Sequence, residues 1–207
     1  MILAIDTSSA ACSAALLGED GSVAACADEI IGRGHAERLA PMIAEMLDGR
    51  IPSSILVGVG PGSFTGIRVG IAAAHGLAIG WDVPLAGIDS LALTAATVLA
   101  GIESPAAGVA VAHAGGHGEL FVRSFDRSGA PTDEARNLTP EDAASAIASV
   151  LVAGSGADAL VAARGSGTAL PTLPSARYAL ALPEALRSLD PKPSYGRAPD
   201  VKPRIAA

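Results

Sequence analysis

One stretch in the first half of the chain constrains the fold more than any other. Residues 55–80 read ILVGVGPGSFTGIRVGIAAAHGLAIG. The short apolar start, ended by Gly-Pro-Gly, predicts a buried strand that stops at a tight turn. The hydroxyl of Ser63 or Thr65 is placed to cap a helix that follows. The chain is therefore expected to fold around a strand, a turn and a helix.

The predicted helix carries a stripe of small residues, because Gly66, Gly70 and Ala74 recur every four positions. Such a stripe lets another backbone approach the helix closely. Glycine inside a helix costs about 0.5–1 kcal/mol relative to alanine, so close packing must offset that cost. Packing within the fold and docking of a partner helix are both compatible with the stripe.

The same stretch matches neither of two well-known catalytic motifs. A phosphate-binding P-loop needs a Lys and a Ser or Thr directly after its last glycine, whereas Gly66 is followed by Ile67 and Arg68. The Gly-x-Ser-x-Gly spacing of a nucleophile elbow is also missing. A peptidase is a further hypothesis, but no Ser-His-Asp arrangement can be assigned from the sequence.

Composition argues against autonomous binding of nucleic acid. The 207 residues carry a net charge of −7, and only 3% of them are aromatic. Phosphate would be repelled by such a chain, and few side chains could stack on bases. The length suffices for one large domain or two small ones.

The sequence predicts a soluble, cytoplasmic protein without a membrane segment. The start, MILAIDTSS, lacks the basic region and the long apolar region of a signal peptide. No purely apolar run reaches the length of a membrane span. Cys12 and Cys26 are expected to be buried free thiols rather than a disulfide or a metal pair.

The first hundred residues predict the element order βββαβαβα, with a sheet that is antiparallel on one side and parallel on the other. This order is characteristic of a ribonuclease-H-like unit. The expected helices include 35–48, in which Pro41 should cause a kink or mark the true start. Met42 and Met46 widen its apolar stripe, which indicates either core filling or an adaptable partner surface.

The second half repeats this organisation weakly, with strands near 108–112, 119–125 and 151–153 and a helix over 139–149. Glycines and prolines leave 157–183 without an assignment. We expect a first domain over 1–102 and a smaller, degenerate domain over 103–207. The latter ends in a Pro-rich tail whose basic residues are either solvated or in contact with phosphate: Lys192, Arg197, Lys202 and Arg204.

Four segments carry a resemblance to the TsaB (YeaZ) family: MILAIDTSSAACSAALL, GHAE at 34–37, VGVGPGSFTGIRVGIAAAHGLAIG and YGRAPD at 195–200. The resemblance is close over the first 100 residues. It implies an α/β protein of two ribonuclease-H-like domains of the actin/hexokinase/Hsp70 superfamily, with mixed sheets flanked by helices.

The resemblance also implies a function. Family members are non-catalytic subunits of the machinery that transfers a threonylcarbamoyl group to N6 of adenosine 37 in tRNAs reading ANN codons. The expected partners are a TsaD-like catalytic subunit, a TsaE-like ATPase and, when the chain is alone, a second copy. No cofactor of its own is expected, since ATP and metal belong to the partner subunits. The tRNA is expected to be contacted only through the complex.

In the family, helices matching 35–48 and 64–80 form a bundle with the same helices of the partner. The interface residues expected from this resemblance are His35, Glu37, Leu39, Met42, Met46, Phe64, Thr65, Gly66, Arg68, Gly70 and Ala74. Arg68 taken alone is compatible with a solvent-reaching or salt-bridged side chain, and the resemblance adds an ion pair between subunits as the rival interpretation.

A vestigial nucleotide site is expected at Asp6, Thr7 and Ser8, because catalytic members of the superfamily hold a nucleotide's metal with an acid at the end of the first strand. The hairpin here lacks the phosphate-cradling glycine, so the rival interpretation is that Asp6 caps its own turn. The alternative function is an autonomous nucleotide-binding enzyme.

Metal binding is not expected. His113 and His117 have helical spacing, but the glycines around them argue against a helix. Where this chain has His113-Ala114-Gly115, the family more often has Asp-Ala-Arg. His35 and Glu37 have the His-x-Glu spacing of a zinc deaminase. That chemistry also requires a downstream Pro-Cys-x-x-Cys motif, which the sequence lacks.

Overall fold

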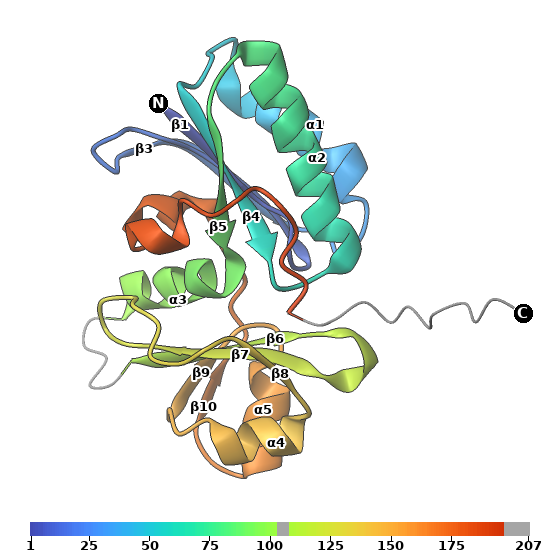
Figure 1. Ribbon diagram of the computed structural model, residues 1–207, viewed down its shortest axis with the longest axis vertical. Helices are drawn as coiled ribbons and strands as arrows, with labels where there is room; N and C mark the ends of the chain where they lie inside the picture. The colour runs from blue at the N-terminus through green and yellow to red at the C-terminus, as the bar shows by residue number, and fades with distance from the viewer. Residues whose placement is uncertain (103–107, 197–207) are drawn as a thin grey trace, which may run out of the picture.

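The computed structural model describes residues 1–102 and 108–196, which form two five-stranded mixed sheets (Figure 1). The strands of the first sheet are β1 (Ile2–Asp6), β2 (Ala11–Leu17), β3 (Val23–Ile30), β4 (Ser54–Gly60) and β5 (Leu85–Asp89). The strands of the second sheet are β6 (Val109–Ala114), β7 (Leu120–Phe125), β8 (Arg136–Leu138), β9 (Leu151–Ala153) and β10 (Thr168–Leu170).

The two sheets share one topology. Their strand orders are β3-β2-β1-β4-β5 and β10-β9-β6-β7-β8. In each sheet, three consecutive strands form an antiparallel meander, and the first of them pairs in parallel with the fourth. The fifth strand then pairs in parallel with the fourth. This confirms the predicted fold class of two ribonuclease-H-like units.

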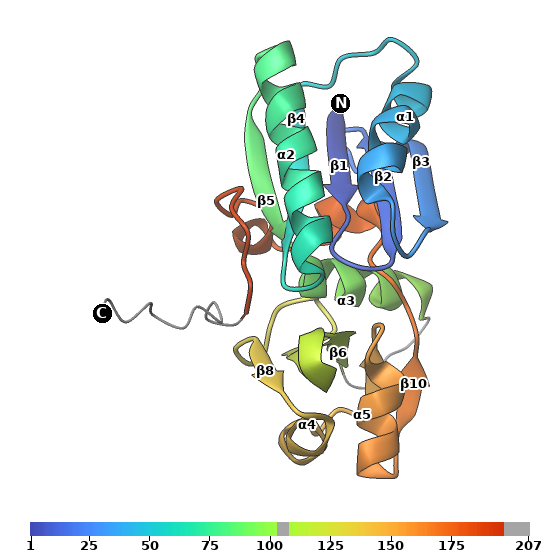
Figure 2. The ribbon, with the colours of Figure 1, turned by 90° about the vertical axis from the view of Figure 1, so that its right-hand side faces the viewer.

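The helices lie in three layers around the sheets (Figures 1 and 2). The α-helices are α1 (His35–Leu47), α2 (Phe64–Trp81), α3 (Ser90–Gly101), α4 (Pro140–Ala146) and α5 (Ala157–Arg164). The 3-10 helices are η1 (Gly116–Gly118), η2 (Ala176–Ala181) and η3 (Glu184–Leu186). One layer, α1 and α2, covers the outer face of the first sheet, and another, α4 and α5, covers the outer face of the second. Between the two sheets lies α3.

Burial on all sides distinguishes α3 from the other helices. Its side chains from Ser90 to Ala96 are all buried, and they share one core with residues of both sheets. A helix that is apolar all round is stable only when it is covered on every side. Because α3 serves both sheets, the two halves have one continuous core between them.

After β10 the chain returns to the first sheet. Leu189 pairs with Gly87 beside β5, with N···O distances of 2.7 and 3.0 Å. Ser194 N donates to Val59 O at 2.8 Å. The described end of the chain therefore packs on the first half, alongside β5 and α2 (Figure 1). The predicted boundary near 103–105 lies outside the described residues, as do Arg197, Lys202 and Arg204.

The small-residue stripe of α2 faces the chain's own β1–β2 turn. Ser63 N donates to Ser8 O at 2.7 Å, and the Ser63 side chain caps the helix by accepting from Gly66 N. The Thr7 hydroxyl donates to Gly66 O at 2.7 Å. A Cβ atom at Gly66 would collide with Thr7 O, and one at Gly70 would collide with Thr7 Oγ1. The stripe is thus explained by packing within the fold.

Several local expectations need correction. Pro41 lies inside α1, which begins six residues earlier at His35, so it does not mark the helix start. Met42 and Met46 are buried, which supports core filling. The helix expected over 139–149 ends at Ala146. Reasoning from the sequence missed β8, α5 and β10, since each is short and its apolar pattern is interrupted by glycine or polar residues.

Two glycine substitutions should have opposite effects on the free energy of unfolding. Gly66→Ala should lower it by about 1–3 kcal/mol, because the added methyl group overpacks against backbone. Gly76→Ala is the matched control, since no atom outside the helix lies within 4 Å of its Cβ position. There we expect a gain of about 0.4–1 kcal/mol. Urea unfolding of the isolated chain measures both, and equal effects would contradict the close approach of Thr7.

Candidate functional site

An apolar groove runs between α1 and α2 on the outer surface of the first half. Its volume is about 320 Å³. The lining residues are small or apolar: Ala40, Ile43, Ala44, Leu47, Ala72, Ala73, Gly76, Leu77 and Trp81. Helices on the surface of a monomer usually present a polar outer face. A groove without a single charged lining residue is therefore a candidate for binding another apolar surface.

The exposed side of α2 extends this apolar surface beyond the groove. Ile79 is 81% exposed and Phe64 is 57% exposed. Over its whole length α2 has only three clearly polar side chains, those of Thr65, Arg68 and His75. The helix is thus apolar on the side that contacts the sheet and also on much of the side that faces solvent.

The structure divides the eleven predicted interface residues into two groups. Seven are packed within the chain: His35, Leu39, Met42, Met46, Gly66, Gly70 and Ala74. This side of α1 and α2 contacts the first sheet and the β1–β2 turn, so the seven residues pack within the chain, and their contact with a partner stays a prediction. Four remain exposed: Glu37, Phe64, Thr65 and Arg68.

Sequence reasoning missed the groove residues themselves. Ala40 and Ala44 on α1, and Ala72 and Gly76 on α2, also recur every four positions. This spacing was an available signal, but the stripe at Gly66 and Gly70 looked equally suitable for a partner. Only the packing on Thr7 separates the inner stripe from the outer one.

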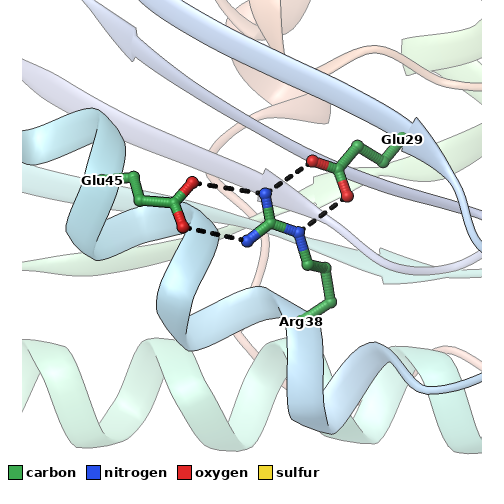
Figure 3. A network of polar contacts seen from close by, with 3 residues as sticks. All are labelled: Glu29, Arg38 and Glu45. Carbon is green, nitrogen blue, oxygen red and sulfur yellow. Dashed lines mark hydrogen bonds and ion pairs between the residues drawn. The ribbon is translucent and has the colours of Figure 1, made fainter.

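A charged group holds α1 against the edge strand β3 (Figure 3). Arg38 of α1 donates from Nη2 and Nε to the two carboxylate oxygens of Glu29, at 2.6 and 2.7 Å. Glu45, two turns further along α1, accepts from the same guanidinium at 3.3 and 3.4 Å. The hydrogen bonds from Arg38 lower the pKa of Glu29. The group orients α1, which forms one wall of the groove.

A second cavity, of about 560 Å³, lies where α1 and α2 begin. It brings together four of the predicted interface residues: His35, Glu37, Thr65 and Gly66. The His35 ring is nearly buried, and its Nε2 atom lies 3.1 Å from Ala11 O. That contact anchors the start of α1 to β2.

Asp6 lies at the end of β1 and is fully buried. Its Oδ1 atom accepts from Ser8 N at 2.9 Å and from the Ser8 hydroxyl at 2.8 Å, while Oδ2 accepts from the Ser90 hydroxyl at 2.8 Å. Burial raises the pKa of Asp6, and these hydrogen bonds partly offset that effect. Both oxygens are held within the chain, as the turn-capping interpretation predicted. This counts against the nucleotide-binding role expected for Asp6, Thr7 and Ser8.

A partly buried ion pair joins the two halves next to this centre. Arg123 Nη1 of β7 lies 3.0 Å from Asp89 Oδ2 at the end of β5. The other oxygen of Asp89 accepts from Ala92 N at 2.9 Å and caps α3. Burial raises the pKa of Asp89, and the Ala92 and Arg123 contacts oppose the rise.

His113 and His117 lie in different environments. His113 is buried on β6, with Nε2 2.8 Å from Thr94 Oγ1. Burial lowers the pKa of His113 to about 4, and the nearby Pro61 backbone opposes that shift. His117 lies in the following turn with a φ of 60°. Within 1–102 and 108–196, no three His, Cys, Asp or Glu side chains gather closely enough to hold a metal ion.

The two cysteines are free thiols, but they are not equally buried. Cys12 is buried, and burial together with the nearby Glu29 raises its pKa to about 11. Cys26 is half-buried beside Arg177. The prediction of a buried thiol is confirmed for Cys12 and only partly met for Cys26.

Comparison with known proteins identifies the family. The model of the family described as TsaD, tRNA N6-adenosine threonylcarbamoyltransferase, matches residues 27–178. A crystal structure from Pseudomonas aeruginosa, described as an uncharacterized protein with similarity to peptidase YEAZ, is 31% identical with a TM-score of 0.76. The match covers 95% of this chain and 99% of that one. The chain belongs to the TsaB (YeaZ) family.

Other relatives agree with this assignment. YeaZ from P. aeruginosa is 30% identical with a TM-score of 0.72, over 87% of this chain and 89% of its own. The tRNA threonylcarbamoyladenosine biosynthesis protein TsaB of Escherichia coli is 44% identical over 94 residues, 43% of this chain and 40% of that protein. The protein of the same name from Haemophilus influenzae is 43% identical, over 43% of this chain and 39% of its own length. The matched segment thus spans about two fifths of these curated relatives.

Among the described residues, no helix is both long enough and apolar enough to cross a bilayer.

The buried His113 predicts a defined loss of stability in acid. Its pKa is lower in the folded chain than the usual value of 6.5, so the unfolded chain binds the proton first as the pH falls. The contribution of His113 is complete above pH 6.5 and declines by about 3 kcal/mol by pH 4.

Comparing the wild type with His113→Gln by urea unfolding between pH 7.5 and 4 isolates this contribution. Asp6 and Asp89, whose raised pKa values act in the opposite direction, contribute equally to both proteins and cancel in the difference. Parallel stability curves for the two proteins would contradict the prediction.

Proposed function

We propose that this chain is a non-catalytic scaffold subunit in the synthesis of threonylcarbamoyladenosine in tRNA, acting on adenosine 37 of tRNAs that read ANN codons. The observation that carries the proposal is the exposed apolar groove between α1 and α2. The names of the E. coli and H. influenzae relatives supply the pathway. The chain would serve in it by holding a partner rather than by reacting with substrate.

The proposed partner is a TsaD-type subunit. The TsaD family model matches 27–178 of this chain, so the two proteins share sequence pattern over most of this fold. Equivalent helices on such a partner could pack against α1 and α2 as one four-helix bundle. Burying apolar surface contributes about 25 cal/mol per Å², which makes the groove the main source of affinity. A second copy of this chain would occupy the groove only when the TsaD-type subunit is missing.

The remaining components follow from this arrangement. A TsaE-type ATPase would join the pair, and ATP and metal would belong to the partner subunits. The net charge of −7 opposes direct binding of tRNA by this chain, so tRNA would be held through the complex. The soluble pair would act in the cytoplasm.

An autonomous nucleotide-binding enzyme is the alternative function. It requires the Asp6 carboxylate to reach a metal-bound nucleotide, whereas that carboxylate is fully buried under Ser8 and Ser90. Calorimetry with ATP and magnesium at high protein concentration separates the two proposals. Tight binding that is lost in Asp6→Asn would favour the enzyme over the scaffold.

Filling the groove should prevent partner binding without unfolding the chain. Ala72 is exposed, so Ala72→Arg should leave the free energy of unfolding within about 0.5 kcal/mol of the wild type. The arginine would place a charge in the apolar contact, and we expect loss of the complex with a TsaD-type subunit. Size-exclusion chromatography with light scattering measures the complex, and formation of the modified adenosine measures its activity.

Ala162→Arg provides the matched control, since Ala162 is also an exposed helical alanine but lies on α5 in the second half. It should bind the partner like the wild type. Full complex formation by Ala72→Arg would overturn the assignment of the groove.

A further inference from the structure

Three side chains are in contact at the start of α2, where the Arg68 guanidinium stacks on the Phe64 ring and is hydrogen-bonded to Tyr195. The guanidinium carbon of Arg68 lies 3.3 Å from the centre of the Phe64 ring and 5.1 Å from that of Tyr195. The two ring centres are 5.2 Å apart. Arg68 Nε donates to the Tyr195 hydroxyl at 3.0 Å. We call this group, Phe64, Arg68 and Tyr195, the arginine sandwich.

The end of the described chain holds the sandwich in place. Ser194 N donates to Val59 O at 2.8 Å, and Pro191 O lies 3.3 Å from His75 Nε2 on α2. Tyr195 is therefore positioned from both β4 and α2. The sandwich pairs residues that are 127 positions apart in the sequence, and only the return of the chain to the first half brings them together.

One edge of the guanidinium is left open. Arg68 is exposed, and its two terminal amino groups make no hydrogen bond or ion pair with the described residues. The planar fork of arginine matches the two oxygens of a carboxylate. Stacking and the Tyr195 contact already restrict the side chain, so less rotamer entropy is lost when an anion binds.

The position of Arg68 relates this open edge to the groove. Arg68, Ala72 and Gly76 follow one another at intervals of four residues on α2, and all three are exposed. Residues four apart are neighbours on a helix surface. Arg68 is therefore the polar end of the row whose next two members line the groove.

The anion is more consistent with a protein side chain than with nucleic acid. The chain has a net charge of −7, which disfavours approach of a phosphate backbone. A second copy of this chain could also supply a carboxylate, from the exposed Glu37 on its α1, so binding is measured with the TsaD-type subunit and not with a homodimer.

We propose that the arginine sandwich binds a carboxylate side chain on the helix of the TsaD-type subunit that fills the groove. This inference rests on the proposed function, which supplies the helix. The apolar row provides affinity, and the carboxylate, met by the open edge of Arg68, fixes the direction and register of the docked helix. The Tyr195 hydroxyl accepts a hydrogen bond from Arg68 Nε, so its own proton is free to be donated to the same carboxylate.

The test measures the dissociation constant of the complex with the TsaD-type subunit at several salt concentrations. Arg68→Gln should weaken binding by about 10-fold or more, because a bond to a charged group is lost. Arg68→Lys should recover only part of that loss, since an ammonium lacks the fork. Tyr195→Phe should weaken binding about 3-fold, since the rings remain but Nε is no longer held. The effect of Arg68→Gln should shrink as salt increases.

Arg127→Gln is the control for net charge, because Arg127 is an exposed arginine in the second half. Equal affinities of Arg68→Gln and Arg127→Gln, with Ala72→Arg still unable to bind, would overturn the sandwich as an anchor and leave the scaffold intact. No complex with the wild-type chain would refute the proposed function itself. Loss of tRNA binding with unchanged partner affinity would identify a phosphate contact and overturn the proposal.

Discussion

The whole structure depends on the burial of α3 between the two sheets. This helix has almost no polar face, so it is stable only if both sheets cover it. Asp89 caps its first turn and pairs with Arg123 of β7, which fixes the second sheet relative to the first. Removing Arg123 would leave the buried Asp89 carboxylate without its charged partner, which is unfavourable. The two halves consequently share one core.

This arrangement separates an internal polar centre from an external apolar face. Asp6, Ser8 and Ser90 hold the turns at the ends of β1 and β5, and no described group there is open to solvent. The groove between α1 and α2 lies on the face of the first sheet that is turned away from α3. A rigid core with an exposed apolar groove favours a role in binding, since little reorganisation precedes association.

Much of the first half could be predicted from the sequence, because long periodic segments and strong caps agreed with each other. The capped start of α2, for which Ser63 was one of two candidates, the β1–β3 meander and the parallel β4 all follow from local patterns. Short elements such as β8 and α5 could not be predicted, since three to eight residues carry too little periodicity and depend on packing against neighbours. The arginine sandwich could not be predicted either, because Tyr195 is 127 positions away from Arg68 in the sequence.

The sequence by itself determined a strand, a tight turn and a capped helix of small residues, together with the family resemblance. Only the tertiary structure decided which side of that helix faces inward. Small residues occur on both sides of α2, at Gly66 and Gly70 and again at Ala72 and Gly76. The contacts of Thr7 place the first pair against the β1–β2 turn and leave the second pair exposed. Helical periodicity describes a helix without stating its surroundings, so the docking face could be recognised only once the chain had folded.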